Sequence, residues 1–146
     1  MSERLGYRGY IGSRSYFGSR APQHVQNLVA RDFCARNGYR FLISATEYAM
    51  PGCYMILEDV VREAGKLDGV VCYSIFMLPM KQERRLDVVR RLFDAGATLH
   101  GAVENIHVRN DEELKRMELL WAVQAAQMPA ASFAADASPA TSLRGA

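Results

Sequence analysis

Two Gly-Ser-Arg tripeptides in close succession, Gly12-Ser13-Arg14 and Gly18-Ser19-Arg20, are the part of this sequence that most directly indicates chemistry. Guanidinium groups offer forked donors that match phosphate or carboxylate, and a loop entering a helix also presents backbone N–H groups to an anion. The segment therefore predicts an anion site in which Arg14, Ser19 and Arg20 bind the ligand. The alternative is a solvated polar loop whose serines only cap the next helix. A GxxxxGK[ST] phosphate loop is absent.

Three further side chains are candidates for catalysis. Glu47 and Glu104 follow predicted strands, where they would serve in general acid–base chemistry or instead pair with the loop arginines. Ser13 would act as a nucleophile only if a base or a strongly electropositive pocket activated it. His100 and Glu104 would lie ~13 Å apart along one strand, which is too far for a dyad.

Two polar residues complete the predicted ligand site. Gln26 lies on the first predicted helix and Ser74 at the end of the third strand, and both would orient the ligand. The pairs Arg84-Arg85 and Arg90-Arg91 are expected on a solvated helix surface, although Arg84 lies close enough to the third strand to join the site.

The thiols and imidazoles do not indicate a metal or a cofactor. The cysteines are odd in number, form no CxxC pair and stand in apolar segments, so all three are expected to be reduced and buried. The histidines lack metal-ligand spacing. These residues are Cys34, Cys53, Cys72, His24, His100 and His107. We expect no metal and no cofactor.

The elements that position these residues alternate between period 2 and period 3.6. Strands are predicted at 7–12, 39–44, 69–76 and 98–104, the third hydrophobic enough for a central parallel strand. Because a helical segment follows each strand, we expect a three-layer α/β domain. Its mainly parallel four-stranded sheet would carry helices on both faces. Ligands of such sheets bind beyond the carboxyl ends of the strands, so the candidate residues should converge there.

Four helices are predicted, each from an apolar stripe. The first opens at Pro22, and Asn110 with Glu113 resembles a capping box for the last. The inward positions are Val25, Leu28, Val29 and Phe33; Cys53, Ile56, Leu57, Val60, Val61 and Ala64; Leu86, Val89 and Phe93; and Leu114, Met117, Leu120, Trp121 and Met128.

The composition sets limits on the class of protein. The chain has 146 residues, of which 49% are hydrophobic and 23% charged, enough for one domain with a normal core. We expect that domain over 1–128 and a disordered Ala/Ser/Pro-rich tail over 129–146. A net charge of +2 argues against a dedicated nucleic-acid binder. Without a signal core or an apolar run of about 20 residues, we expect a cytoplasmic protein with no membrane insertion.

Several segments resemble the catalytic domain of serine recombinases, the resolvases and invertases. They are GYIGSR, the helix holding Gln26, DGVVCY and VENI, and the resemblance runs from about Tyr7 to Met128. It implies the recombinase fold but not the activity. In the family's Arg-x-Ser step an arginine, Arg14, takes the nucleophile's place. Met77 and Met80 take the places of two catalytic arginines, and we expect no DNA-reading domain in this chain.

A closer resemblance, over nearly the whole chain before the tail, is to the bacterial sporadic carbohydrate cluster proteins. It rests on GYIGSR, PQHVQNLVARDFC, SATEYAM, CYMILE, DGVVCYSIFMLP and LHGAVEN in this order. That family is named for genes that lie among those for surface or lipopolysaccharide sugars. The resemblance implies a pathway context and no assigned catalytic residues.

Together these observations predict an accessory protein or enzyme of bacterial surface-carbohydrate biosynthesis. It would bind a phosphorylated or carboxylated sugar at the strand ends and would not be an active recombinase. The alternative is a non-enzymatic scaffold that dimerises through its last helix and partners a pathway enzyme. Residual, sequence-independent DNA binding is a third reading.

Overall fold

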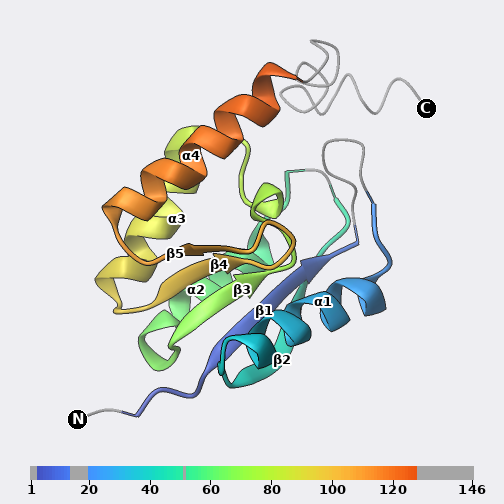
Figure 1. Cartoon of the computed structure of the whole chain (residues 1–146), viewed down its shortest axis with the longest axis vertical. Coiled ribbons are helices and arrows are strands. Elements are labelled where there is room, and N and C mark those ends of the chain that lie inside the picture. Colours follow the sequence, from blue (N-terminus) through green and yellow to red (C-terminus); the bar gives the residue numbers. More distant parts are fainter. Residues whose placement is uncertain (1–2, 14–19, 51, 128–146) are drawn as a thin grey trace.

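A five-stranded sheet in the order β2-β1-β3-β4-β5 forms the centre of the molecule in the computed structural model, which describes residues 3–13, 20–50 and 52–127 (Figure 1). The strands are β1 (Tyr7–Gly12), β2 (Phe41–Glu47), β3 (Gly69–Cys72), β4 (Thr98–Gly101) and β5 (Ile106–Val108). The first four are parallel, and β5 pairs with β4 in the antiparallel direction. β3 is central and wholly buried, as its continuous hydrophobicity predicts.

Helices cover both faces of this sheet, which confirms the predicted three-layer α/β fold. On one face, α1 (Gln23–Arg36) buries Phe33 and Cys34 against Val71. On the other, α2 (Met55–Arg62) and α3 (Gln82–Asp94) pack on the sheet, and α4 (Asp111–Ala126) adds Met117 and Trp121 to the same core. Short 3₁₀ turns at Ala64–Lys66 and Ile75–Met77 follow α2 and β3.

The predicted strand over 98–104 is wrong in its second half, and the sheet has five strands instead of four. β4 ends at Gly101, residues 102–105 form a turn, and the chain returns as β5. Asn105 has φ 53°, a left-handed conformation that asparagine tolerates better than most residues. Since the return strand is only three residues long, no period-2 pattern marks it in the sequence.

The buried face of α1 also differs from the prediction. Val25 and Leu28 are 36% and 56% exposed, and Gln26 and Ala30 are buried in their place. The helix is rotated because the Gln26 amide has hydrogen-bond partners beneath it and the small Ala30 allows close approach to the sheet. The α2 stripe, in contrast, is buried at Leu57, Val60 and Val61 as predicted.

On α3 and α4 two predicted positions are wrong. Arg85, expected on the solvated surface, is 4% exposed, and Leu120, expected in the core, is 38% exposed. The start of α4 is as predicted, since Asn110 Oδ1 accepts from Glu113 N at 2.9 Å. None of the helices in the described ranges is both long and apolar enough to cross a bilayer. Residues 129–146, the predicted tail, lie outside the described residues.

Candidate functional site at the carboxyl edge of the sheet

At the carboxyl end of β1, the side chain of Gln26 holds the backbone of Gly12. Gln26 Oε1 accepts from Gly12 N at 3.0 Å, and Nε2 donates to Gly12 O at 2.6 Å and to Ala21 O at 2.7 Å. The amide therefore ties together the two ends of the segment that contains Ser13 and Arg20. Gln26, predicted to bind the ligand, is 1% exposed. Its amide instead positions the backbone at Gly12 and Ala21.

Glu47, at the end of β2, is buried and braces the start of α2. Its carboxylate accepts from Tyr10 Oη at 2.8 Å, from Leu57 N at 2.9 Å and from Ile56 N at 3.0 Å. A carboxylate at this place satisfies free N–H groups and complements the helix dipole. No arginine is among its partners in the described part of the chain.

Ser74 and Glu104 come together across the ends of β3 and β4. Ser74 Oγ donates to Glu104 Oε2 at 2.6 Å, and Ile75 N donates to Glu104 Oε1 at 2.9 Å. Ser74 Oγ also accepts from Phe76 N at 3.1 Å, which starts the short 3₁₀ turn. The two predicted residues thus shape the loop after β3. Glu104 and His100 do not share a strand, since β4 ends at Gly101, and they have different partners among the described residues.

The amino end of α1 faces this edge and is electrostatically distinct from the other helix starts. Pro22 provides no side-chain cap and the first turn holds no acidic residue, whereas Arg20 and His24 are both exposed there. Ser13, half-buried, directly follows Gly12. Arg14 and Ser19, predicted to bind the ligand, lie outside the described residues.

The apolar side chain of Met77 lies beside Gly12 at the carboxyl end of β1. A Cβ atom placed on Gly12 would lie 3.4 Å from Met77 Cε and 3.6 Å from Glu47 Cβ. Met77 is buried, and its thioether lies in contact range of the strand end.

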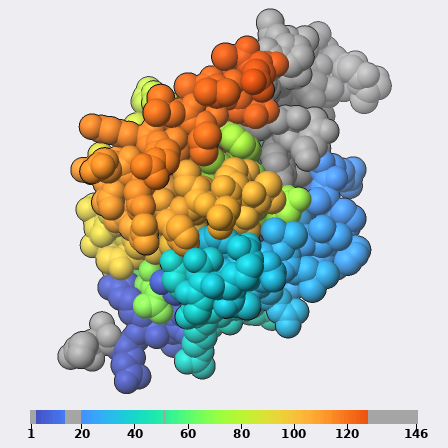
Figure 2. All heavy atoms as spheres, viewed as in Figure 1, coloured from blue at the N-terminus to red at the C-terminus, as the bar shows by residue number. Residues whose placement is uncertain are grey.

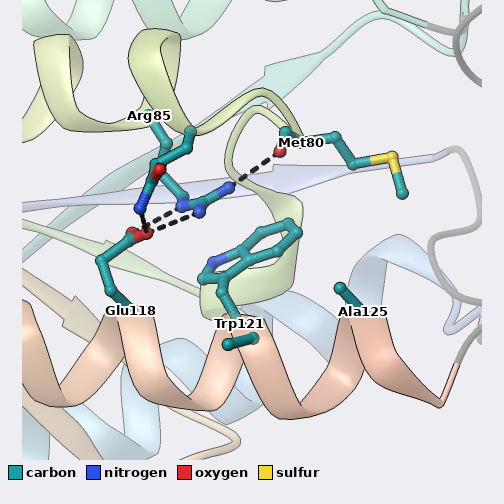
Figure 3. Close-up of a pocket in the computed structure, with 7 residues that line it drawn as sticks. Met80, Arg85, Glu118, Trp121 and Ala125 are labelled. Carbon is teal, nitrogen blue, oxygen red and sulfur yellow. Dashed lines mark hydrogen bonds and ion pairs between the residues drawn. The ribbon is translucent and has the colours of Figure 1, made fainter.

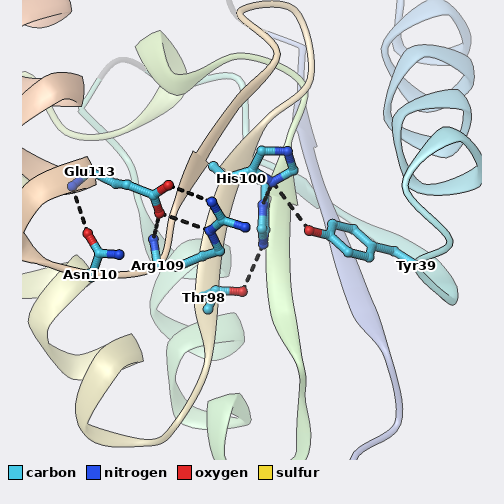
Figure 4. Close-up of polar contacts among 7 residues, drawn as sticks. Tyr39, Thr98, His100, Arg109, Asn110 and Glu113 are labelled. Atoms are coloured by element: carbon cyan, nitrogen blue, oxygen red, sulfur yellow. Dashed lines mark hydrogen bonds and ion pairs between the residues drawn. The ribbon is translucent and has the colours of Figure 1, made fainter.

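A second polar cluster, which was not predicted from the sequence, lies on the β4–β5 hairpin (Figure 4). His100 and His107 are cross-strand partners whose Nδ1 atoms are 2.8 Å apart. Thr98 Oγ1 lies 2.8 Å from His100 Nε2 and 3.3 Å from Asp68 O, so the imidazole of His100 has a hydrogen-bond partner at each of its ring nitrogens. Burial and the neighbouring His107 lower the pKa of His100 to about 3. Only the turn formers around Asn105 could have indicated this pairing. In Figure 2 the hairpin surfaces between α1 and α4.

A pocket of about 210 Å³ between α3 and α4 was also not predicted (Figure 3). Arg85 forms two 2.7 Å hydrogen bonds with Glu118, donates to Pro79 O and Met80 O, and lies 4.1 Å from the centroid of the Trp121 ring. The bidentate pair fixes the α3–α4 packing. A periodicity analysis could not identify it, because arginine at a helical surface position is ordinarily solvated.

The three cysteines agree only partly with the expectation that all of them are buried. Cys34 and Cys72 are buried free thiols, and burial raises the pKa of Cys34 to about 11. Cys53, predicted to be buried, is half-exposed, and its thiol lies 3.8 Å from Glu47 Oε2 at the rim of the site.

Within the described ranges, no three His, Cys, Asp or Glu side chains gather in a way that could hold a metal ion.

Comparisons with known proteins agree with the fold. No protein-family profile and no curated protein matches the sequence. Among solved structures, a resolvase family site-specific recombinase from Streptococcus pneumoniae is 12% identical with a TM-score of 0.55, over 95% of each chain. The N-terminal catalytic domain of TP901-1 integrase is 14% identical with a TM-score of 0.56, over 82% of this chain and 92% of that chain. The chain therefore has a resolvase-like catalytic-domain fold; at these identities the likeness concerns the fold alone.

Proposed function

We propose that the protein binds an anionic, sugar-type ligand at the carboxyl edge of its sheet, as an accessory protein or enzyme of bacterial surface-carbohydrate biosynthesis and not as a recombinase. The ligand's phosphate or carboxylate would lie between Ser13, Arg20 and the amino end of α1, with Arg14 and Ser19 as further contacts. The carbohydrate context and the cytoplasmic location rest on the sequence and its resemblance.

The observation that supports this proposal is a difference among the helix starts. The start of α2 receives the buried carboxylate of Glu47, and that of α4 has Asn110 as its cap and three acidic residues in its first turn. The described first turn of α1 has neither a side-chain cap nor an acid, and two basic side chains stand beside it. A helix start with free N–H groups attracts an anion.

The same geometry argues for binding more than for acid–base catalysis. In the described residues, the carboxylates of Glu47 and Glu104 accept hydrogen bonds from hydroxyls and backbone N–H groups of neighbouring elements. Met77 places a thioether beside Gly12, at the position that resembles an arginine position of recombinases, where a phosphoryl-transfer site needs a cation. Ser13 remains the candidate nucleophile should a reaction occur.

A thermal-shift screen with nucleotide sugars and sugar phosphates tests the proposal. We expect stabilisation of the wild type and its loss in Arg14→Ala and Arg20→Ala. Arg36→Ala removes an exposed arginine at the opposite end of α1 that pairs with Asp32; it is the matched control and should respond like the wild type. The ligand proposal fails if no anionic sugar stabilises the wild type.

A second candidate, the dimeric scaffold, is favoured by the outer face of α4. Leu119 and Val123 are 67% and 57% exposed, and with Leu120 they form an apolar stripe on the last described helix. A second copy of the chain would cover this stripe, since an exposed apolar patch commonly marks an interface.

Light scattering separates the two candidates. The scaffold proposal expects a dimer that Leu119→Lys with Val123→Lys converts to a monomer, while Ser13→Ala with Arg14→Ala leaves carbohydrate production intact. A monomeric wild type over the micromolar range would remove it.

A further inference from the structure

Three side-chain atoms of kinds that bind metal ions meet between α1 and the β4–β5 hairpin. His100 and His107 are cross-strand partners whose Nδ1 atoms lie 2.8 Å apart, and Tyr39 Oη lies 3.3 Å from His107 Nδ1 (Figure 4). Tyr39 belongs to the connection from α1 to β2. No ligand spacing marks these residues in the sequence, because the pairing of β4 with β5 is what brings the two imidazoles together.

The separation of these atoms is close to that of ligands around a tetrahedral metal ion. Ligand atoms about 2.0–2.1 Å from a zinc ion lie about 3.3 Å from one another. His107 Nδ1 and Tyr39 Oη have this separation, and the two Nδ1 atoms would have to move apart by about 0.5 Å. His107 is half-buried, so its ring can move towards solvent by this amount. The third ligand is a phenol oxygen and not a further His, Cys or carboxylate.

His100 is held for metal binding by the contacts of its other ring nitrogen. Its Nε2 lies 2.8 Å from Thr98 Oγ1, which donates to Asp68 O at 3.3 Å. Because that carbonyl can only accept, this chain of contacts accommodates a proton on Nε2 and leaves the lone pair on Nδ1. A metal-binding histidine is ordinarily held in this way, by an acceptor that fixes both the ring and its tautomer.

The charges around the cluster permit a cation. Arg109 and Glu113 act electrostatically on both imidazoles, and they pair with each other through hydrogen bonds of 2.6 and 2.9 Å, so their charges largely cancel. Burial and the neighbouring His107 lower the pKa of His100 to about 3, so this imidazole is unprotonated at neutral pH, as a metal ligand must be. Imidazole donors favour zinc and similar transition metals over magnesium or calcium.

We propose that His100 Nδ1, His107 Nδ1 and Tyr39 Oη form a binding site for a divalent transition-metal ion of the zinc class. Three protein ligands leave the fourth position of a tetrahedral ion to water. The site shares no residue with the carboxyl edge of the sheet and does not rest on the proposed function. A bound ion would join the connection after α1 to the hairpin and thereby stabilise the folded chain.

Calorimetric titration of the full chain with zinc chloride tests the proposal. We expect one zinc ion to bind per chain and to raise the urea midpoint of unfolding. His107→Ala should weaken zinc binding by at least about 100-fold, and Tyr39→Phe or Thr98→Val by about tenfold. In NMR spectra, zinc should shift the ring signals of His100 and His107 and leave those of His24 unchanged.

Two matched variants separate this site from other zinc-binding side chains. His24→Ala removes an exposed histidine of α1 and Cys53→Ser removes the half-exposed thiol, and both should bind zinc like the wild type. Urea unfolding without zinc verifies that each variant is folded. The proposal is overturned if zinc at millimolar concentration does not bind the wild type, if His107→Ala or Tyr39→Phe retains the full affinity, or if Cys53→Ser abolishes binding.

Discussion

The side-chain amide of Gln26 binds both the N–H and the C=O of Gly12. Gln26 Oε1 lies 3.0 Å from Gly12 N, and Gln26 Nε2 lies 2.6 Å from Gly12 O. The same nitrogen donates to Ala21 O at 2.7 Å. One buried side chain thus closes the base of the segment between β1 and α1. The proposed anion site would depend on this clamp, because the clamp sets where Ser13 leaves the sheet and where Arg20 approaches the helix.

Replacing the clamp should destabilise the fold measurably. Gln26→Met keeps the length of the side chain but leaves buried groups of Gly12 and Ala21 unsatisfied, so we expect a loss of about 3 kcal/mol in the free energy of unfolding. Urea denaturation measures it. Gln23→Met, an exposed position on the same helix, is the control and should change stability by less than about 0.5 kcal/mol. Equal effects at the two positions would contradict the clamp.

Glu47 should behave as a structural residue. Glu47→Ala removes the acceptor of Tyr10 Oη and of two N–H groups at the start of α2, for which we expect about 3 kcal/mol of destabilisation. Tyr10→Phe removes one of these bonds and should cost about 1 kcal/mol. Unfolding curves of both variants are compared with the wild type. A stable Glu47→Ala protein that has lost only a chemical activity would show that Glu47 is catalytic.

The parts of the fold that the sequence predicts are those whose side-chain period is undisturbed. The α2 stripe and the continuous apolar β3 sit in uniform surroundings, so periodicity alone places them. The face of α1 is wrongly predicted because a polar residue, Gln26, is buried to bind backbone, and hydrophobicity ranks the exposed Leu28 above it. The turn at Asn105 and the short β5 carry too few residues for a period to appear.

The candidate site is predictable in place but not in detail. The rule that ligands bind at carboxyl strand ends brings Gly12, Glu47, Ser74 and Glu104 to one edge, as the structure has them. The sequence alone does not indicate which carboxylate and amide oxygens already accept hydrogen bonds from neighbouring N–H groups. It therefore could not separate the positioning residue Gln26 from ligand-binding residues, or find the Tyr54–Arg84 contact between two different loops.

The buried ion pair between α3 and α4 should contribute far more than an exposed one. Arg85→Leu leaves Glu118 poorly solvated without its partner, for which we expect about 3 kcal/mol of destabilisation. Arg90→Leu breaks a solvent-exposed pair with Asp111 and should cost less than about 1 kcal/mol. Both values come from urea unfolding at neutral pH. Comparable losses would mean that Arg85 is as solvated as Arg90.

The histidine pair should make stability depend on pH below neutrality. The pKa of His100 is lowered to about 3 from an ordinary 6.5, so between these values the unfolded chain takes up a proton that the folded chain does not. Stability is therefore complete above pH 6.5 and falls as the pH decreases towards 3. His100→Gln should flatten this dependence between pH 6.5 and 5, while the exposed His24→Gln keeps it. An unchanged slope in His100→Gln would contradict the assignment.

The central claim, an anion site at the carboxyl edge, is tested most directly by following backbone amide signals in an NMR titration with a nucleoside diphosphate-sugar. The account predicts saturable shifts of Gly12, Ser13, Arg20 and the first turn of α1, with α4 unaffected. Shifts confined to the α3–α4 surface, or none at millimolar ligand, would contradict it.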